Sequence, residues 1–227
     1  MLELVGLNAG YGAIQIVWDV SLTVRPGEVV ALVGRNGAGK STTLKAIVGL
    51  AQVFSGSIRV GGRSLVGRPT ALMASYGIGY VPQERELCAN LSVEENLLVP
   101  IYARRLPRKR LGAIYERFSR LKERRNQKAG SLSGGERKLL AFARILLLDP
   151  AVLLVDEPVE GLMPAVVAEV GGLIRQLCAG GTGVLLVEQD VGLIRRTADR
   201  AYLMSRGRIE ASVREIGQRE LAQFLGI

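Results

Sequence analysis

Short apolar runs recur along the chain and predict the buried strands of a sheet. Runs of four or five residues have the length expected of strands that are buried on both faces. Between the later runs, apolar residues recur at helical spacing over residues 164–178 and 190–197. Strands that alternate with helices predict an α/β fold with a mostly parallel sheet covered by helices on both faces. The predicted strands of this sheet are Val29–Val33, Ile78–Val81, 151–155, 183–187 and 200–204.

The N-terminal part of the chain has further strand signals. Residues 2–7, residues 20–24 and Ser57–Val60 are predicted as strands, and a Pro26-Gly27 turn precedes the first buried run.

Residues from about Leu91 to Leu148 have a helical pattern that interrupts the alternation. Ser92 and Glu95 have the spacing of a capping box, which marks a helix start. Pro107 separates two basic helical segments, and a further helix follows Gly134-Gly135. We therefore predict one domain over residues 1–227, with a sheet-containing core formed by 1–83 and 150–227 and an inserted helical subdomain formed by 84–149.

A glycine-rich segment between the run Val29–Val33 and a predicted helix has the pattern of a phosphate-binding loop. Its glycines let successive backbone N–H groups point inward, and the helix start adds the positive end of its dipole. Lys40 is expected to reach the β- and γ-phosphates of a nucleotide, and Ser41 is expected to hold Mg²⁺. The residues predicted to bind the nucleotide here are Gly34, Asn36, Gly37, Ala38, Gly39, Lys40, Ser41 and Thr42.

The apolar run 151–155 ends in two acidic residues, Asp156 and Glu157. A strand buried on both faces accommodates two carboxylates only where its end faces a site. Asp156 is expected to bind Mg²⁺ directly or through water. Glu157 lies one residue further on, where it is expected to take a proton from a water molecule that attacks the γ-phosphate.

A second helix start with glycines lies at Ser131–Lys138. It places the Ser133 hydroxyl, Gly134 and Gly135 immediately before Glu136. This is a second site suited to an anion in a chain that already has one. An ordinary helix cap needs no second glycine, so the segment is predicted to have a functional role.

Composition excludes several classes of function. The chain has 227 residues, 48% of them hydrophobic, and contains no histidine. A Ser-His triad, a histidine-ligated metal and a histidine general base are therefore excluded.

Cys88 and Cys178 fit no metal or redox spacing and are expected to be reduced thiols packed as small hydrophobes. No apolar run approaches the ~20 residues that cross a bilayer and no secretory leader is recognised, so we expect a protein that reaches a membrane only through partners.

The net charge of +9 is concentrated in residues 104–128. This segment holds eleven basic residues and two acidic ones, Glu116 and Glu123, while the rest of the chain is close to neutral. Such a segment suits nucleic acid, an anionic membrane surface or an acidic partner, or it forms a solvated helical face.

The order and spacing of these motifs resemble the ATP-binding subunit of ABC transporters. The matching segments are the phosphate loop at 34–41, Leu132–Glu136, the acid-ended strand 151–157 and Gln83. The resemblance implies a P-loop NTPase (RecA-like) core with an antiparallel N-terminal β subdomain and the inserted helical subdomain. It also implies ATP and Mg²⁺ as cofactors. Two such domains are expected to meet head to tail, so that Ser133, Gly134, Gly135 and Glu136 of each close over the ATP of the other.

The same resemblance assigns roles to three more residues. Tyr11 is expected to stack on adenine, and Gln83 to contact Mg²⁺ and the attacking water. Most members of the family have a histidine where this chain has Gln189, whose amide can hydrogen-bond a γ-phosphate but carries no charge. Val159 stands where members of the family commonly have Ser or Thr. The resemblance therefore does not imply, for this chain, the hydrogen bond that such a hydroxyl makes between the two domains of the pair.

Residues 120–127, the run Val187–Gln189 and the short C-terminus are similar to the LivF-type ATPase of branched-chain amino acid importers. Urea and short-amide importers have a closely similar subunit. The implied partners are a second ATPase subunit, in a heterodimer or for the isolated chain a homodimer, two integral-membrane permease subunits and, indirectly, an extracytoplasmic solute-binding protein. The implied location is the cytoplasmic face of a bacterial inner (plasma) membrane.

Two rival classes are open at this point. The basic segment 104–128 suggests an ABC-type ATPase that serves nucleic acid. Against it, the chain has no coiled-coil arm, zinc module or duplicated cassette, and the segment has few aromatic residues for stacking bases. No specific nucleic acid partner is therefore expected. A P-loop kinase would need an acceptor site and has no use for Leu132–Glu136.

Overall fold

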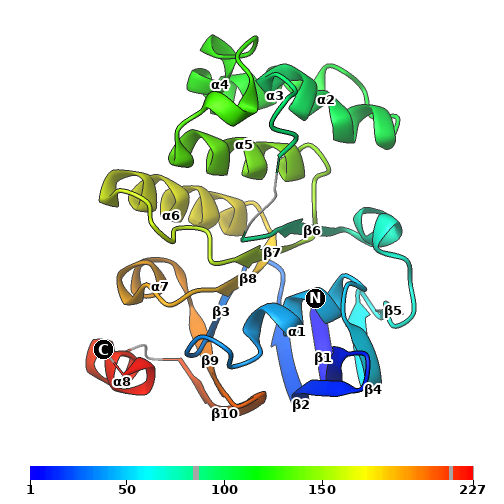
Figure 1. Cartoon of the computed structure of the whole chain (residues 1–227), viewed down its shortest axis with the longest axis vertical. Coiled ribbons are helices and arrows are strands. Elements are labelled where there is room, and N and C mark those ends of the chain that lie inside the picture. Colours follow the sequence, from blue (N-terminus) through cyan, green and yellow to red (C-terminus); the bar gives the residue numbers. More distant parts are fainter. Residues whose placement is uncertain (84–86, 215–216, 227) are drawn as a thin grey trace.

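Two sheets and the helices packed on them make up the structure, a computed structural model that describes residues 1–83, 87–214 and 217–226 (Figure 1). One sheet has the strand order β10-β9-β3-β8-β7-β6, and the other has the order β2-β1-β4-β5. Within the described ranges, no helix combines the length and the apolar character needed to cross a bilayer.

The six-stranded sheet confirms the predicted parallel core. β3 (Val29–Val33) pairs in parallel with β8 (Gly183–Val187) and β9 (Arg200–Ser205). β7 (Val152–Asp156) pairs in parallel with β8 and with β6 (Ile78–Val81). Every residue of β3, β7 and β8 is buried, as their continuous apolar sequence predicts. The residues just after these parallel strands therefore meet at one edge of the sheet.

Two C-terminal elements were not predicted. β10 (Arg208–Val213) adds an antiparallel edge to β9, and α8 (Gln218–Leu225) comes after it. The apolar residues Ile209 and Val213 of β10 are only partly buried, and most of the strand is exposed. Because such an edge strand contributes few buried apolar residues, its hydrophobic pattern does not predict a strand.

The four-stranded sheet is antiparallel, and its strands are longer than predicted. It contains β1 (Leu2–Tyr11), β2 (Ile14–Val24), β4 (Gln52–Val60) and β5 (Arg63–Ser64). The predicted strands cover only parts of β1, β2 and β4, because register shifts interrupt their alternation.

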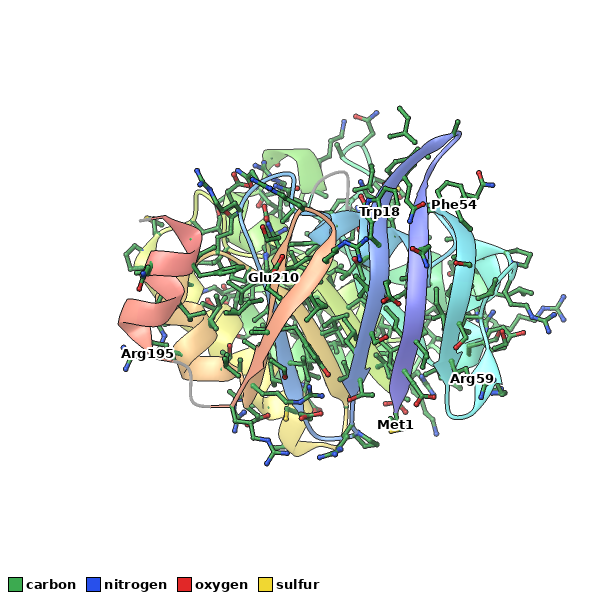
Figure 2. The ribbon with its side chains drawn as sticks, turned by 90° about the horizontal axis from the view of Figure 1, so that it is seen from below. Met1, Trp18, Phe54, Arg59, Arg195 and Glu210 are labelled. Atoms are coloured by element: carbon green, nitrogen blue, oxygen red, sulfur yellow. The ribbon has the colours of Figure 1, made fainter. Side chains whose placement is uncertain are left out.

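The two sheets meet where β2 passes the turn between β9 and β10. The Trp18 backbone N–H donates to the Gly207 carbonyl at 2.8 Å. The Arg208 guanidinium lies over the Trp18 ring, 5.8 Å from its centroid. Figure 2 shows β10 beside β2, with the labelled Trp18 near their upper ends. This contact holds the antiparallel sheet next to the strands that carry the phosphate loop.

The helices pack at several places around the two sheets (Figure 1). α1 packs between the sheets, α6 and α7 cover the six-stranded sheet, and the remaining helices up to α5 gather at the far end of the molecule. The predicted capping box at Ser92 is present, and Pro107 lies between α2 and α3 as predicted. Besides α8, the described helices are α1 (Lys40–Ile47), α2 (Val93–Ala103), α3 (Arg110–Arg117), α4 (Ser119–Glu123), α5 (Gly134–Leu146), α6 (Pro164–Ala179) and α7 (Val191–Thr197), with 3₁₀ turns at Thr70–Tyr76 and Ala129–Ser131.

The helical insertion and the six-stranded sheet share one hydrophobic core. Leu97 of α2 and Phe142 of α5 belong to the same buried cluster as Leu153 and Val155 of β7. The other face of the sheet forms a second cluster with α1 and the antiparallel sheet. The subdomain boundary at 84–149 stays a prediction, and its residues 84–86 lie outside the described ranges.

Gly79 of β6 lies so close to α5 that replacement by alanine should destabilise the fold. An added Cβ would lie 2.5 Å from Ile145 Cγ2 and 3.1 Å from Pro150 Cβ. Overpacking a filled core costs about 1–3 kcal/mol, and each kcal/mol lowers the melting temperature by about 2–4 °C at this size. The control is Gly112→Ala in α3, where no atom lies within 4 Å of the added Cβ. Thermal denaturation in which G112A melts at or below G79A would contradict this packing argument.

Candidate functional site

Residues 34–39 form a tight loop between β3 and α1. Gly37 and Gly39 have φ angles of 78° and 103°, in the left-handed region that glycine adopts without strain. A Cβ added at Gly34 would lie 2.3 Å from the Met204 carbonyl oxygen of β9. The conformation of the loop therefore depends on glycine at these three positions.

Lys40 is the first residue of α1, and its side chain is 4% exposed. Its ammonium group donates to the carbonyls of Gly34 and Arg35 at 2.8 and 3.1 Å. The same group forms an ion pair with Glu157 Oε1 at 3.3 Å. The lysine therefore lies folded along the loop, with its buried charge balanced by a carboxylate from another element.

Asp156 ends β7 and faces the loop. Its Oδ1 accepts a hydrogen bond from Ser41 Oγ at 2.9 Å, and its Oδ2 accepts one from the Tyr80 hydroxyl at 3.4 Å. Burial raises the pKa of Asp156, and the nearby charge of Glu157 acts in the same direction. The hydroxyl and carboxylate predicted to hold a metal are therefore adjacent. Tyr80 was not predicted, because a tyrosine in an apolar strand gives no sign of its partner.

Glu157 is the residue on which the other predicted catalytic groups converge. Its Oε1 accepts from Gln189 Nε2 at 2.8 Å and also contacts Lys40, and its Oε2 accepts from Gln83 Nε2 at 3.0 Å. Its backbone φ is 43°, an uncommon left-handed conformation for a residue with a side chain. The side chain is 8% exposed, so these contacts are made with little screening by water.

The two glutamines also bind second partners. Gln189 Nε2 donates to Asn36 Oδ1 at 2.8 Å, and Gln83 Nε2 donates to Glu160 Oε2 at 2.7 Å. They thus link the ends of β6, β7 and β8 to one another and to the phosphate loop. Glu160 was not among the predicted site residues, although an acid in the loop just after Glu157 was a usable signal.

These side chains border a cavity of about 400 Å³. A polyphosphate fits its chemistry, since the backbone N–H groups of the loop and the Lys40 ammonium are donors for phosphate oxygens. Ile16 of β2 was missed because the first half of that strand was not predicted. The cavity is lined by Ile16, Asn36, Gly37, Ala38, Gly39, Lys40, Ser41, Thr42, Gln83, Glu157 and Glu160.

The second predicted anion site borders a neighbouring cavity and not this one. Ser133 is exposed and caps α5, accepting from the Glu136 N–H at 3.3 Å, while the Ser133 N–H donates to Glu136 Oε2 at 3.0 Å. None of the described residues lining the phosphate-loop cavity belongs to 131–138. Gly134, Arg137 and Lys138 border a neighbouring cavity of about 590 Å³. The lining that this cavity shares with the phosphate-loop cavity is Gln83, Glu157 and Glu160. Gly135 lets α5 approach α6, since an added Cβ would lie 2.8 Å from Val166 Cγ2.

Two other residues are placed differently from the main cluster. Tyr11 ends β1 with its side chain 40% exposed, and it is not among the described residues that line the phosphate-loop cavity. Its stacking on adenine stays a prediction. Val159 is 5% exposed and belongs to the hydrophobic core. Its side chain therefore packs inward.

Part of the basic segment 104–128 is occupied by contacts within the chain. Arg108 pairs with Glu94 at 3.2 Å, and Arg124 pairs with Glu136 at 2.7 Å. Arg110 donates to the Leu147 carbonyl at 2.7 Å, and Arg117 donates to Gln176 Oε1 at 3.0 Å. These contacts favour a structural use for several of the charges.

Comparison with known proteins identifies the family. The family model described as ABC transporter matches residues 17–160. The chain is 42% identical over 211 residues to the high-affinity branched-chain amino acid transport ATP-binding protein BraG of Pseudomonas aeruginosa, a match covering 92% of this chain and 91% of that protein. It is 39% identical over 212 residues to a probable branched-chain amino acid transport ATP-binding protein, LivF, of Archaeoglobus fulgidus, covering 92% and 90%.

A solved structure extends the similarity to the fold. A dimeric ATP-binding cassette in a post-hydrolysis state, bound to ADP and Pi, is similar with a TM-score of 0.84 and 25% identity, covering 94% of this chain and 98% of that chain. The motif-based resemblance and the predicted P-loop fold are confirmed by these matches. This chain belongs to the ABC transporter family as a nucleotide-binding ATPase subunit, a class of subunit that works with membrane permease components.

Proposed function

We propose that this protein energises the import of branched-chain amino acids. It binds Mg-ATP together with a second, different ATPase subunit of like fold and drives two permease subunits at the cytoplasmic face of a bacterial plasma membrane. A solute-binding protein on the other side acts indirectly. The two relatives named for branched-chain amino acid transport support this solute class.

The observation that carries the proposal is that the two anion sites border different, adjoining cavities. The phosphate loop borders a cavity whose described lining includes no residue of 131–138, and Ser133 is exposed at the start of α5. The Ser133 hydroxyl makes its hydrogen bonds within its own capping box. It is thus accessible to a second molecule. The dimeric form of a similar cassette bound to ADP and Pi supports a pair in which each Ser133 faces the other subunit's nucleotide.

The residues at the phosphate loop have distinct proposed roles. Lys40 and the loop N–H groups bind the β- and γ-phosphates, while Ser133, Gly134, Gly135 and Glu136 of the partner cover the γ-phosphate. Tyr11 stacks on adenine. The oxygen ligands fit Mg²⁺, because the Ser41 hydroxyl and the Asp156 carboxylate lie 2.9 Å apart and Gln83 borders the same cavity. When bound, Mg²⁺ neutralises charge on the phosphates.

Glu157 is the proposed general base, and its contacts suggest how its activity depends on nucleotide. Both carboxylate oxygens accept hydrogen bonds, and Lys40 lies 3.3 Å from one of them. A triphosphate carries more negative charge than a single carboxylate and attracts the Lys40 ammonium away from Glu157 toward the bound phosphates. Gln189 can then turn its amide to the γ-phosphate. Both movements free Glu157 Oε1 to accept a proton from the attacking water.

Transport in a reconstituted system tests the solute class. Vesicles holding the permeases, both ATPase subunits and the solute-binding protein should accumulate labelled leucine, isoleucine and valine only when ATP is present on the ATPase side. Urea and acetamide serve as competitors. Accumulation of urea in place of leucine would assign the alternative importer class. No uptake, with turnover stimulated by DNA in a salt-dependent manner, would favour a nucleic acid partner.

Replacing Glu157 by glutamine should separate binding from hydrolysis. The amide keeps the shape of the side chain and cannot act as a base, so turnover should fall by about 10²- to 10⁴-fold. Nucleotide binding should persist, and the ATP-bound pair should accumulate as a dimer in size-exclusion chromatography. Glu169→Gln on the exposed side of α6 is the control. Phosphate release by E157Q at the wild-type rate would show that Glu157 is not the base.

Replacing Ser133 by alanine should impair turnover more than the loss of a helix cap explains. Ser92→Ala is the matched control, because Ser92 caps α2 through the same type of capping box with Glu95. Each variant should lose about 1 kcal/mol of stability. The rate of phosphate release should fall at least about tenfold in S133A, because the variant lacks a hydrogen-bond donor to the charge that develops on the γ-phosphate. The rate should stay near wild type in S92A. Equal turnover in the two variants would remove the support for the two-molecule site.

A further inference from the structure

Gln189 needs to be held in place to make its contacts. Its amide nitrogen lies 2.8 Å from both Glu157 Oε1 and Asn36 Oδ1. A glutamine side chain has three rotatable bonds, and ordering such a side chain costs up to about 2 kcal/mol. The amide can stay between Glu157 and the phosphate loop only if the backbone that carries it is itself fixed.

The side chain of Glu188 fixes that backbone. It is 4% exposed and turned into the protein. Its Oε1 accepts hydrogen bonds from the backbone N–H groups of Gln189 and Asp190 at 2.8 and 3.1 Å. One carboxylate oxygen thus holds two successive peptide groups in the connection between β8 and α7.

The connection is also anchored on either side of these two peptides. The Val187 carbonyl accepts from the Glu157 N–H at 2.9 Å. Asp190 caps α7 by accepting from the Leu193 N–H at 2.6 Å. Between these anchors, the Glu188 carboxylate is the group that orients the peptide from which the Gln189 side chain extends.

Burying the Glu188 carboxylate costs desolvation free energy, and its two hydrogen bonds, both to Oε1, leave the other oxygen without a partner in the described part of the chain. Its Oε2 is buried and has no hydrogen-bond partner among the residues that the structure describes. Burial raises the pKa of Glu188, and the nearby charges of Glu157 and Asp190 act in the same direction. A neutral side-chain amide could accept both N–H groups at a smaller desolvation cost. The two hydrogen bonds to the loop need only an accepting oxygen at the position of Oε1, which a glutamine side chain can also supply.

We infer that Glu188 is a positioning residue for ATP hydrolysis, and that its Oε1, by holding the backbone of Gln189 and Asp190, places the Gln189 amide between Glu157 and the phosphate loop, from where it can turn to the γ-phosphate. This inference rests on the proposed role of Glu157. It assigns no contact between Glu188 and nucleotide.

Four single variants separate the hydrogen bonds of Glu188 from its packing and charge. E188A removes the acceptor, E188M removes it while filling the space, E188Q keeps it without charge, and Q189A removes the positioned amide. E188A and E188M should lower kcat by about 10- to 100-fold, as expected for a small displacement of a catalytic contact, with KM for ATP little changed. E188Q should stay within about threefold of wild type.

Hydrogen exchange and a double-mutant cycle give readouts that general destabilisation would not. Exchange of the Gln189 and Asp190 amides should accelerate in E188M and stay as in wild type in E188Q. Because Glu188 acts through Gln189, E188M in the Q189A background should lower kcat no further than Q189A alone.

Besides an E188M variant with wild-type kcat, two results would overturn the inference. One is an E188M effect on kcat that adds fully to the effect of Q189A, and the other is an E188Q variant as impaired as E188M. These results differ from a failure of the proposed function itself. If E157Q hydrolyses ATP at the wild-type rate, the general base is wrong, whereas an inactive E157Q beside a fully active E188M rejects only the role of Glu188.

Discussion

The buried carboxylate of Glu157 is the group on which the arrangement of the nucleotide site depends. It extends from the end of β7 and is contacted by Lys40 of α1, Gln83 after β6 and Gln189 after β8. Taking a carboxylate out of water is costly unless its partners are in place, and removing one partner of a buried ion pair typically costs about 3–5 kcal/mol. Because all these partners come after parallel strands of one sheet, the strand order determines which of them can reach Glu157.

The sequence predicts the parts of this site that are local patterns. The phosphate loop and the acidic pair at Asp156 and Glu157 each stand directly after an apolar run, and both can be recognised from neighbouring residues. Gln83 and Gln189 are polar residues without a local pattern of their own, and resemblance to a family was needed to single them out. Tyr80, Glu160 and Glu188 were missed because their importance comes from partners brought close by folding.

The same division holds for the fold. β3, β7 and β8 are buried on both faces, so their sequences are continuously apolar and were predicted at nearly the observed lengths. The first half of β2 was missed because its residues alternate irregularly between exposed and buried positions around a bulge. β10 was missed because an edge strand contributes little to a core.

Ser133 and Ser92 show why a local motif does not determine a function. Both cap a helix through a serine and a glutamate three residues later, and the structure gives both the same pair of reciprocal hydrogen bonds. The two helices differ in their first residues: Gly134 and Gly135 leave the start of α5 without side chains, whereas Val93 and Glu94 occupy the start of α2. Bare N–H groups at a helix start can approach a phosphate closely, and bulky side chains prevent this.

In the proposed pair, one subunit's loop binds the ground-state triphosphate, and the other subunit's helix start adds charge stabilisation where the γ-phosphate reacts. The Lys40 ammonium and the Ser133 hydroxyl then act on the same phosphate from two different molecules. An interaction that forms only when the two subunits close contributes to the transition state and not to the binding of nucleotide by one subunit. On this proposal turnover requires association, because neither half of the site is sufficient alone.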